Sequence, residues 1–220
     1  MHLIMKYSHR FSWFFLLFMM QLIYFPINRA MYGGWMFRTE VDPYIPLWSS
    51  WAIPYILWLP WWVICFAWAA WKMEDRLYRA FVIATLLVSV IGMAAFIYFP
   101  TYVQRPPLGN QDDWSLELLH FVYANDRVYN AFPSGHVYIA TLIGLFWAQW
   151  FPDHRWWWRA IVVVIASSTL FTHQHYLPDP IGGMLLAWGG YRFSLWWVDY
   201  PGSGERTPYQ PEQESIVHTG

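Results

Sequence analysis

The chain has 220 residues, of which 57% are hydrophobic, 22% aromatic and 12% charged, whereas about a quarter of the residues in an ordinary soluble domain are charged. This composition excludes a typical water-soluble domain and indicates a membrane protein. The net charge of −1 provides no basic field for nucleic acid, and the one cysteine excludes a disulfide framework and a cysteine-based zinc site.

Six apolar stretches are long enough to cross a bilayer, whose hydrocarbon core of about 30 Å takes roughly 20 helical residues. The first lacks a small-residue cleavage site, so we interpret it as a retained helix. The sequence therefore predicts an all-α fold, a polytopic membrane protein with a single domain of six transmembrane helices over residues 1–200. A flexible cytoplasmic tail rich in Gly, Pro, Glu and Gln follows over 201–220. The six stretches are 11–28, 47–71, 80–99, 134–151, 156–175 and 180–199.

The distribution of Lys and Arg predicts the orientation. If both termini are cytoplasmic, nine of these residues lie on the cytoplasmic side and four, Arg29, Arg38, Arg105 and Arg127, on the other. This asymmetry agrees with the positive-inside rule, and we expect an integral protein of the plasma (inner) membrane. In the longest outer segment, apolar spacing predicts a short extracytoplasmic amphipathic helix at 114–124, and residues 29–46 are expected to form a similar surface helix.

Two further patterns concern packing and anchoring. Gly183, Ala187, Gly190 and Ser194 are spaced to share one helical face, which predicts close contact between membrane helices. The many Trp residues are interpreted as anchors at the headgroup level, because Trp and Tyr concentrate at membrane interfaces.

Three groups of polar residues fall on the extracytoplasmic side of this topology. Arg105 follows the third apolar stretch, residues 134–136 (Ser-Gly-His) open the fourth, and His175 and Asp179 lie between the fifth and sixth. Ionisable groups at membrane depth are costly and usually mark a functional site. Each residue alone has an ordinary structural explanation, such as a helix cap or a headgroup contact, but their combination favours a site.

These residue types suit phosphoryl transfer. A helix that begins at Ser134 and Gly135 presents free amides to an anion, and Arg105 offers a planar fork of donors for phosphate oxygens. One imidazole could attack phosphorus while the other protonates the departing oxygen, with a carboxylate to orient the attacking ring. This set requires no metal ion and no cofactor.

At these residues the sequence resembles the type 2 phosphatidic acid phosphatase (PAP2) superfamily, whose membrane members have six helices and three motifs. Residues 133–136 match the second motif, Pro-Ser-Gly-His. His175 and Asp179 match the end of the third, and residues 105–106 match the Arg-Pro that ends the first. The resemblance covers about residues 80–190.

The resemblance implies a role for each matched residue. His175 would be the nucleophile that forms a phosphohistidine, Asp179 its orienting partner, and His136 the acid for the leaving group. Arg105, Ser134 and the Gly135 amide would hold the phosphate.

The sequence departs from the family pattern at two cations. Tyr98 stands where the first motif has Lys, and Thr169 stands where the third has Arg. Residues 99–101 and 168–183 look closer to a divergent branch that includes inositol phosphorylceramide synthase. His173 or Arg127 is a candidate replacement cation, and a histidine in this role would make phosphate binding depend on pH near neutrality.

Four functions are compatible with these features. The first is a metal-independent phosphatase that takes a lipid phosphate from the surrounding membrane lipids and hydrolyses it through a phosphohistidine at the extracytoplasmic face. The second is a headgroup phosphotransferase of the inositol phosphorylceramide synthase type, in which an alcohol replaces water. The third is a metal-dependent hydrolase, and the fourth is a non-catalytic lipid-binding pseudoenzyme. The ligands of the third would be His136, His173, His175 and Asp179, although no His-Glu-x-x-His pattern is present.

Overall fold

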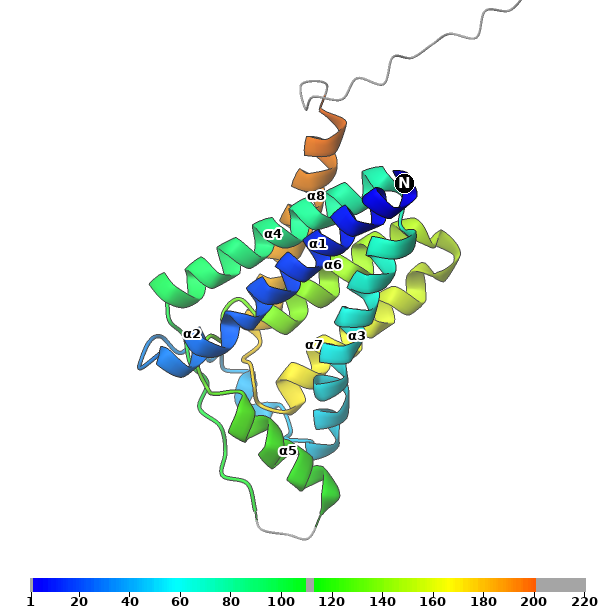
Figure 1. The fold of residues 1–220 in the computed structure, drawn as a ribbon. Coiled ribbons are helices and arrows are strands. Elements are labelled where there is room, and N and C mark those ends of the chain that lie inside the picture. The colour runs from blue at the N-terminus through cyan, green and yellow to red at the C-terminus, as the bar shows by residue number, and fades with distance from the viewer. Residues whose placement is uncertain (1, 110–112, 201–220) are drawn as a thin grey trace, which may run out of the picture.

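The computed structural model describes residues 2–109 and 113–200, and this part of the chain folds as a bundle of helices (Figure 1). It contains α-helices, short 3₁₀ helices and two isolated β-bridges, and no longer strand. The predicted all-α fold is confirmed for these residues. The tail predicted over 201–220 lies outside them. The α-helices are α1 (His2–Leu22), α2 (Tyr24–Ala30), α3 (Ala52–Lys72), α4 (Asp75–Tyr98), α5 (Trp114–Asn125), α6 (Gly135–Trp150), α7 (Arg155–Phe171) and α8 (Pro178–Asp199).

All six predicted apolar stretches are helical, but they differ in length and hydropathy. Within the described residues, His9–Ala30, Ser49–Lys72 and Asp75–Tyr98 are long and apolar enough to cross a membrane. The first of these is divided between α1 and α2. Helices α6, α7 and α8 coincide with the other three stretches, and α6 has 16 residues, a length of about 24 Å. The described helices therefore include three candidate membrane spans, as expected of a membrane protein.

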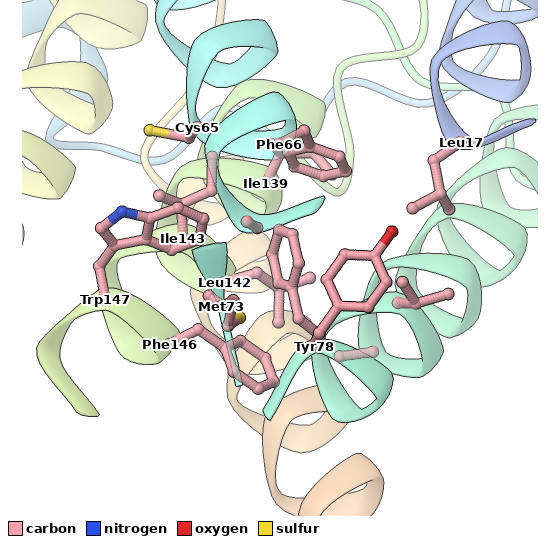
Figure 2. Packing of buried hydrophobic residues seen from close by; sticks show 14 of the residues in the cluster. Leu17, Cys65, Phe66, Met73, Tyr78, Ile139, Leu142, Ile143, Phe146 and Trp147 are labelled. Carbon is pink, nitrogen blue, oxygen red and sulfur yellow. The ribbon is translucent and has the colours of Figure 1, made fainter. Parts of the chain in front are cut away.

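Helix α6 forms the centre of the bundle, where it packs against α4, α7 and α8. Its buried residues join one cluster with side chains from α1, α3 and α4, part of which Figure 2 shows. The ring of Phe81 is 4.7 Å from that of Phe66, 5.3 Å from that of Phe146 and 5.4 Å from that of Trp147, measured between centroids, in edge-to-face contacts. Such contacts add about 0.5–1.5 kcal/mol each to the burial of the rings.

The interpretation of every Trp as an interfacial anchor is wrong for two of them. Trp62 and Trp147 are fully buried in this core, because their rings fill the space between α1, α3, α4 and α6. Trp156 and Trp197 are exposed near helix ends, as anchoring requires.

The small-residue face of α8 packs as predicted. Gly183, Ala187, Gly190 and Ser194 are all buried. A Cβ atom at Gly190 would lie 2.6 Å from a methyl group of Val88 on α4. The absence of side chains therefore lets α8 approach both α4 and α6.

We expect Gly183→Ala to destabilise the protein by about 1–3 kcal/mol, because overpacking a tight contact displaces backbone. A Cβ atom at this position would lie 2.9 Å from the carbonyl oxygen of Ser134 and 3.2 Å from the amide of Tyr138. The matched control is Gly189→Ala on the same helix, where nothing lies within 4 Å of the added atom. Thermal unfolding of the two purified variants in detergent checks this prediction, and equal midpoints would contradict it.

The two predicted surface helices have different outcomes. The first exists as α5, which packs through Leu119 and Val122 against Ala52 and Tyr55 at the start of α3. The prediction of the second, within 29–46, is wrong, because after α2 this segment contains only a short 3₁₀ helix at Asp42–Tyr44.

After α2 the chain turns at Gly33 and Gly34, whose φ angles are 69° and 125°. The amide of Trp35 then donates to the carbonyl of Pro100 at 2.8 Å. A Cβ atom at Gly34 would lie 2.2 Å from that carbonyl oxygen. Glycine conformations therefore replace the helix with an irregular segment that covers the loop after α4.

Candidate active site

The second and third polar groups of the sequence, residues 134–136 and 175–179, meet at one end of the bundle, where α6 and α8 begin and α7 ends. The amide of Ser134, just before α6, donates to the carbonyl of Asp179 at 3.0 Å. The amides of Gln174 and His175 both donate to the carbonyl of Thr169, at 3.0 and 3.1 Å. These bonds fix the turn between α7 and α8 against the start of α6. Figure 1 shows that α5 and the start of α3 lie at this same end.

Three side chains form a hydrogen-bonded chain at this point. The Nδ1 atom of His175 is 3.3 Å from Oδ2 of Asp179, and its Nε2 atom is 3.1 Å from Oγ of Ser134. The backbone amide of Tyr176 also donates to Oδ2 of Asp179, at 2.9 Å. A carboxylate only accepts hydrogen bonds, so Nδ1 carries the ring proton. The lone pair of Nε2 therefore faces Ser134.

Ser134 does not act as an ordinary helix cap. Its backbone precedes α6, but its side chain makes no capping hydrogen bond and is fully buried against His175. The first amides of an α-helix have no partner within the helix. The start of α6 therefore keeps free donors and the positive end of the helix dipole beside His175, an arrangement that binds anions.

The second histidine faces the first across a cavity of about 190 Å³. The ring centroids of His136 and His175 are 6.2 Å apart, with an angle of 68° between the ring planes. The ring of His136 stacks on that of Tyr55 at 4.3 Å and lies tilted against that of Trp58 at 4.4 Å, and both partners belong to α3. Among the described residues, no group forms a hydrogen bond with its ring nitrogens. Its ring is thus held by stacking, while Gly135 and both histidines line the cavity.

Gly135 has space for a side chain at the cavity wall. An added Cβ atom would meet only the ring of Tyr138, at 3.7 Å or more, which is ordinary contact. We expect Gly135→Ala to preserve the thermal unfolding midpoint but to lower turnover of a lipid phosphate by about 10²-fold, since small displacements of a reacting group have effects of this size. Turnover equal to that of the wild type would show that no reacting group approaches this atom.

Arg105 lies behind the cavity wall. Its guanidinium donates to Oε1 of Gln174, the neighbour of the nucleophile candidate His175, and to the carbonyl of Arg127 at 3.0 Å. It also lies 4.4 Å from the centre of the Tyr123 ring. Burial raises the pKa of Tyr123 to about 12, so this phenol stays neutral, and it donates to the carbonyl of Thr172 at 2.9 Å. Arg105 is therefore adjacent to the His175 turn but does not line the cavity.

The two candidate replacement cations point elsewhere. His173 adopts a φ of 51° and its Nε2 atom donates to the carbonyl of Ile45 at 3.1 Å. The guanidinium of Arg127 donates to the carbonyl of Arg29 at 3.0 Å. Both side chains are thus used to hold loops.

The side chains that stand in place of the two missing family cations do not line the cavity either. Tyr98 is 77% exposed at the end of α4. The hydroxyl of Thr169 is buried, and it donates to the carbonyl of Ala166 at 2.7 Å.

The structure adds polar residues that the motifs did not indicate. Tyr24, Tyr55, Asp126 and Asn130 line the same cavity. No spacing in the sequence distinguishes Asp126 from Asp112 and Asp113 in the same loop, and only the folded chain places it beside α3.

The residues named for a metal-dependent hydrolase do not form a ligand cluster. In the described part of the chain, no group of three or more His, Cys, Asp or Glu side chains is placed to hold a metal ion. His173, one of the four, is turned to the Ile45 carbonyl.

The fold and this site define a helical membrane protein with a histidine-based site at one end of its bundle. A family model described as the PAP2 superfamily matches residues 26–193, and the chain belongs to this superfamily. Membership indicates a phosphatase or phosphotransferase. The searches for similar curated proteins and for similar solved structures found no significant match.

Proposed function

We propose that the protein is a membrane-embedded, metal-independent lipid phosphate phosphatase that works through a phosphohistidine. The observation that carries the proposal is the chain Ser134–His175–Asp179, with His136 facing His175 across one cavity. A nucleophile, its orienting carboxylate and a second proton-transfer group within reach of one anion are the set that covalent catalysis requires.

In the first step, the Nε2 lone pair of His175 attacks phosphorus. The bond between phosphorus and the lipid oxygen breaks, and protonated His136 donates its proton to that oxygen. The products are a lipid alcohol and a phosphohistidine. Asp179 keeps the proton on Nδ1 and stabilises the positive charge of the substituted ring, as the aspartate of a serine protease triad does for its histidine.

In the second step, His136, now neutral, takes a proton from water. The resulting hydroxide attacks phosphorus, the bond to Nε2 breaks, and inorganic phosphate leaves. His175 recovers its lone pair and His136 its proton, so the cycle closes without an external reactant other than water.

The phosphate is assigned to the start of α6. The free amides there and the hydroxyl of Ser134 surround the position next to Nε2 of His175, which suits stabilisation of the charged transition state. Arg105 supports this position through its contact with Gln174. His173 would contribute a positive charge only after it leaves the carbonyl of Ile45.

We also propose that α6, α7 and α8 cross the bilayer, which makes six spans, and that both termini are cytoplasmic. The support is the distribution of Lys and Arg, with Lys72, Arg76, Arg155 and Arg159 at the end of the bundle away from the site and the positive-inside rule. The site then faces the extracytoplasmic side of the plasma (inner) membrane.

A phosphotransferase of the inositol phosphorylceramide synthase type is the second candidate. It shares the first step, but an alcohol replaces water in the second. This candidate is favoured by the polar side chains on the cavity wall, Tyr24, Tyr55, Asp126 and Asn130. They could bind an alcohol acceptor, whereas a water molecule needs no binding site of this kind.

Purified protein in detergent tests the two functions against each other. Release of inorganic phosphate from phosphatidate, unaffected by excess chelator, is expected for the phosphatase. Exchange of labelled headgroups between lipids without phosphate release would identify the transferase. Turnover that the chelator abolishes would contradict both.

We expect Asp179→Asn to lower turnover by about 10²- to 10⁴-fold, less than removal of His175, because the ring would lose its orientation and its charge compensation. The carboxylate is 1% exposed and is the hydrogen-bond partner of Nδ1 of His175. Asp153→Asn, at the opposite end of the bundle in an exposed turn, is the matched control. Full activity of Asp179→Asn across the pH range would rule out the assigned partnership.

A further inference from the structure

Another cavity extends toward the end of the bundle away from the two histidines. It is a groove of about 490 Å³, a volume within the range of ordinary ligand sites. Its floor is α6 from residue 141 to residue 149, one side is the first half of α7, and the other side is α8. Helices α7 and α8 both pack against α6 but make little contact with each other, and Figure 1 shows them diverging from the turn that joins them. The groove therefore occupies the angle between α7 and α8.

Two arginines lie at one end of this groove. Arg155 and Arg159 are four residues apart on α7, so they share one helical face, and both line the groove. Their guanidinium carbons lie 5.7 and 4.7 Å from the centre of the Trp156 ring, an exposed side chain of the type that concentrates at membrane interfaces. In the part of the chain that the structure describes, neither guanidinium has an ion pair or a hydrogen-bond acceptor. Both charges are therefore available to an anion at the headgroup level.

The rest of the groove is mostly apolar. Leu145 and Ala148 are half-buried in its floor, and Val163 is 59% exposed in the side that α7 forms. Val163 follows Arg155 by eight residues, which places it about 12 Å further along the helix. The groove thus has a charged end and an apolar end, separated along the direction in which the helices run.

This polarity specifies the chemistry of a ligand. A guanidinium offers a planar fork of donors that fits phosphate oxygens, and an acyl chain fits the apolar end. A soluble anion would leave the apolar end unfilled. A zwitterionic lipid carries a second, positive group that the two arginines repel. An anionic phospholipid satisfies both ends of the groove.

We propose that the groove binds one anionic phospholipid, with the phosphate on Arg155 and Arg159 and an acyl chain along Ala148 and Val163. The lipid fills the angle between α7 and α8 and so stabilises the turn between them, which carries His175. This inference concerns residues outside the candidate active site and does not depend on the proposed function. In the proposed topology the lipid belongs to the cytoplasmic leaflet, where anionic lipids attract basic residues.

The test compares two lipids with equal acyl chains, anionic phosphatidylmethanol and zwitterionic phosphatidylcholine. Native mass spectrometry of the full-length protein in detergent measures the affinity of the first lipid bound. We expect phosphatidylmethanol to bind about 10- to 25-fold more tightly, since each arginine near the headgroups contributes about fivefold. It should also raise the thermal unfolding midpoint more than phosphatidylcholine does, because a ligand of the folded state stabilises that state.

The double variant Arg155→Gln/Arg159→Gln should bind the two lipids about equally and lose the difference in unfolding midpoint. The matched control is Lys72→Gln, which removes an exposed cation at the same end of the bundle that does not line the groove and should keep the preference. Ala148→Phe keeps both arginines but fills the floor of the groove, so it should weaken the binding of both lipids. Its unfolding midpoint without added lipid verifies that it folds.

Equal binding of the two lipids by the wild type, or a preference that survives the double variant, would overturn the proposal. Unchanged lipid binding by folded Ala148→Phe would overturn it as well, and so would displacement of phosphatidylmethanol by an equal concentration of glycerol phosphate, which would indicate a site for soluble anions. His175→Ala should keep the preference, and its loss there would place the lipid in the candidate active site instead. Lipid preference without phosphatase activity would reject the proposed function alone, and activity without the preference would reject the groove alone.

Discussion

His175→Ala is expected to lower the turnover of a lipid phosphate by at least about 10⁴-fold, because loss of an essential nucleophile has effects of this size or larger in other covalent enzymes. The ring is 8% exposed, and both of its nitrogens are engaged, Nδ1 with Asp179 and Nε2 with Ser134. Alanine removes the only protein atom that bonds to phosphorus in the proposed mechanism. Steady-state phosphate release from phosphatidate by the purified variant measures the loss.

Covalent trapping tests the same prediction by a measurement that does not depend on the turnover rate. Brief incubation with ³²P-labelled substrate and an alkaline quench should leave label on the wild-type chain, since phosphohistidine survives base, and none on His175→Ala. The matched control is His154→Ala in an exposed turn at the other end of the bundle, which should keep both activity and label. If His175→Ala turns over substrate as fast as the wild type, the protein does not use this nucleophile.

His136→Gln is expected to have the second largest effect, a loss of about 10²- to 10⁴-fold with phosphatidate, as is typical when a general acid is removed. The lipid alkoxide is a poor leaving group and needs the proton. The p-nitrophenolate ion leaves without one, so release of the first equivalent from p-nitrophenyl phosphate should be nearly normal in this variant. Hydrolysis of the phosphohistidine still needs a base, and we therefore expect a burst of p-nitrophenol followed by slow turnover.

The two substrates separate proton transfer from packing. His136 packs against Tyr55 and Trp58, so its replacement also removes contacts on α3. A structural defect would slow the burst with both substrates by the same factor. Rapid-quench experiments measure the burst amplitude and rate with each substrate. An equal loss of burst rate with phosphatidate and with p-nitrophenyl phosphate would reject His136 as the acid.

The proposed phosphate site retains hydrogen-bond donors despite the departures from the family pattern. The amides at the start of α6 stay free because Ser134 turns its hydroxyl to His175 instead of capping the helix. Neither Tyr98 nor Thr169, the residues at the positions of the missing cations, lines the cavity. Backbone donors and the helix dipole therefore carry more of the proposed phosphate binding than side-chain charge does.

Local sequence patterns predicted the helices well where apolar stretches were long and uninterrupted. The stretch predicted at 134–151 is α6, and the outer helix predicted at 114–124 is α5. The prediction failed where glycine conformation and a tertiary contact decided the backbone, as at Gly33 and Gly34. It also misplaced Trp62 and Trp147, because the aromatic content of a helix does not say whether a neighbouring helix covers a given ring.

By itself, the sequence indicated a helical membrane protein and the candidate residues for phosphorus chemistry, because span length, charge scarcity and the Pro-Ser-Gly-His run are local properties. The tertiary structure alone decided which of those residues share a cavity. It placed His136 and His175 in the wall of one cavity. It also directed His173 to the Ile45 carbonyl and Arg105 to the side chain of Gln174. It also brought Asp126 to Tyr24 and Tyr55, which lie 102 and 71 residues away along the chain. Contacts over such separations depend on how whole helices pack, and no local pattern records that packing.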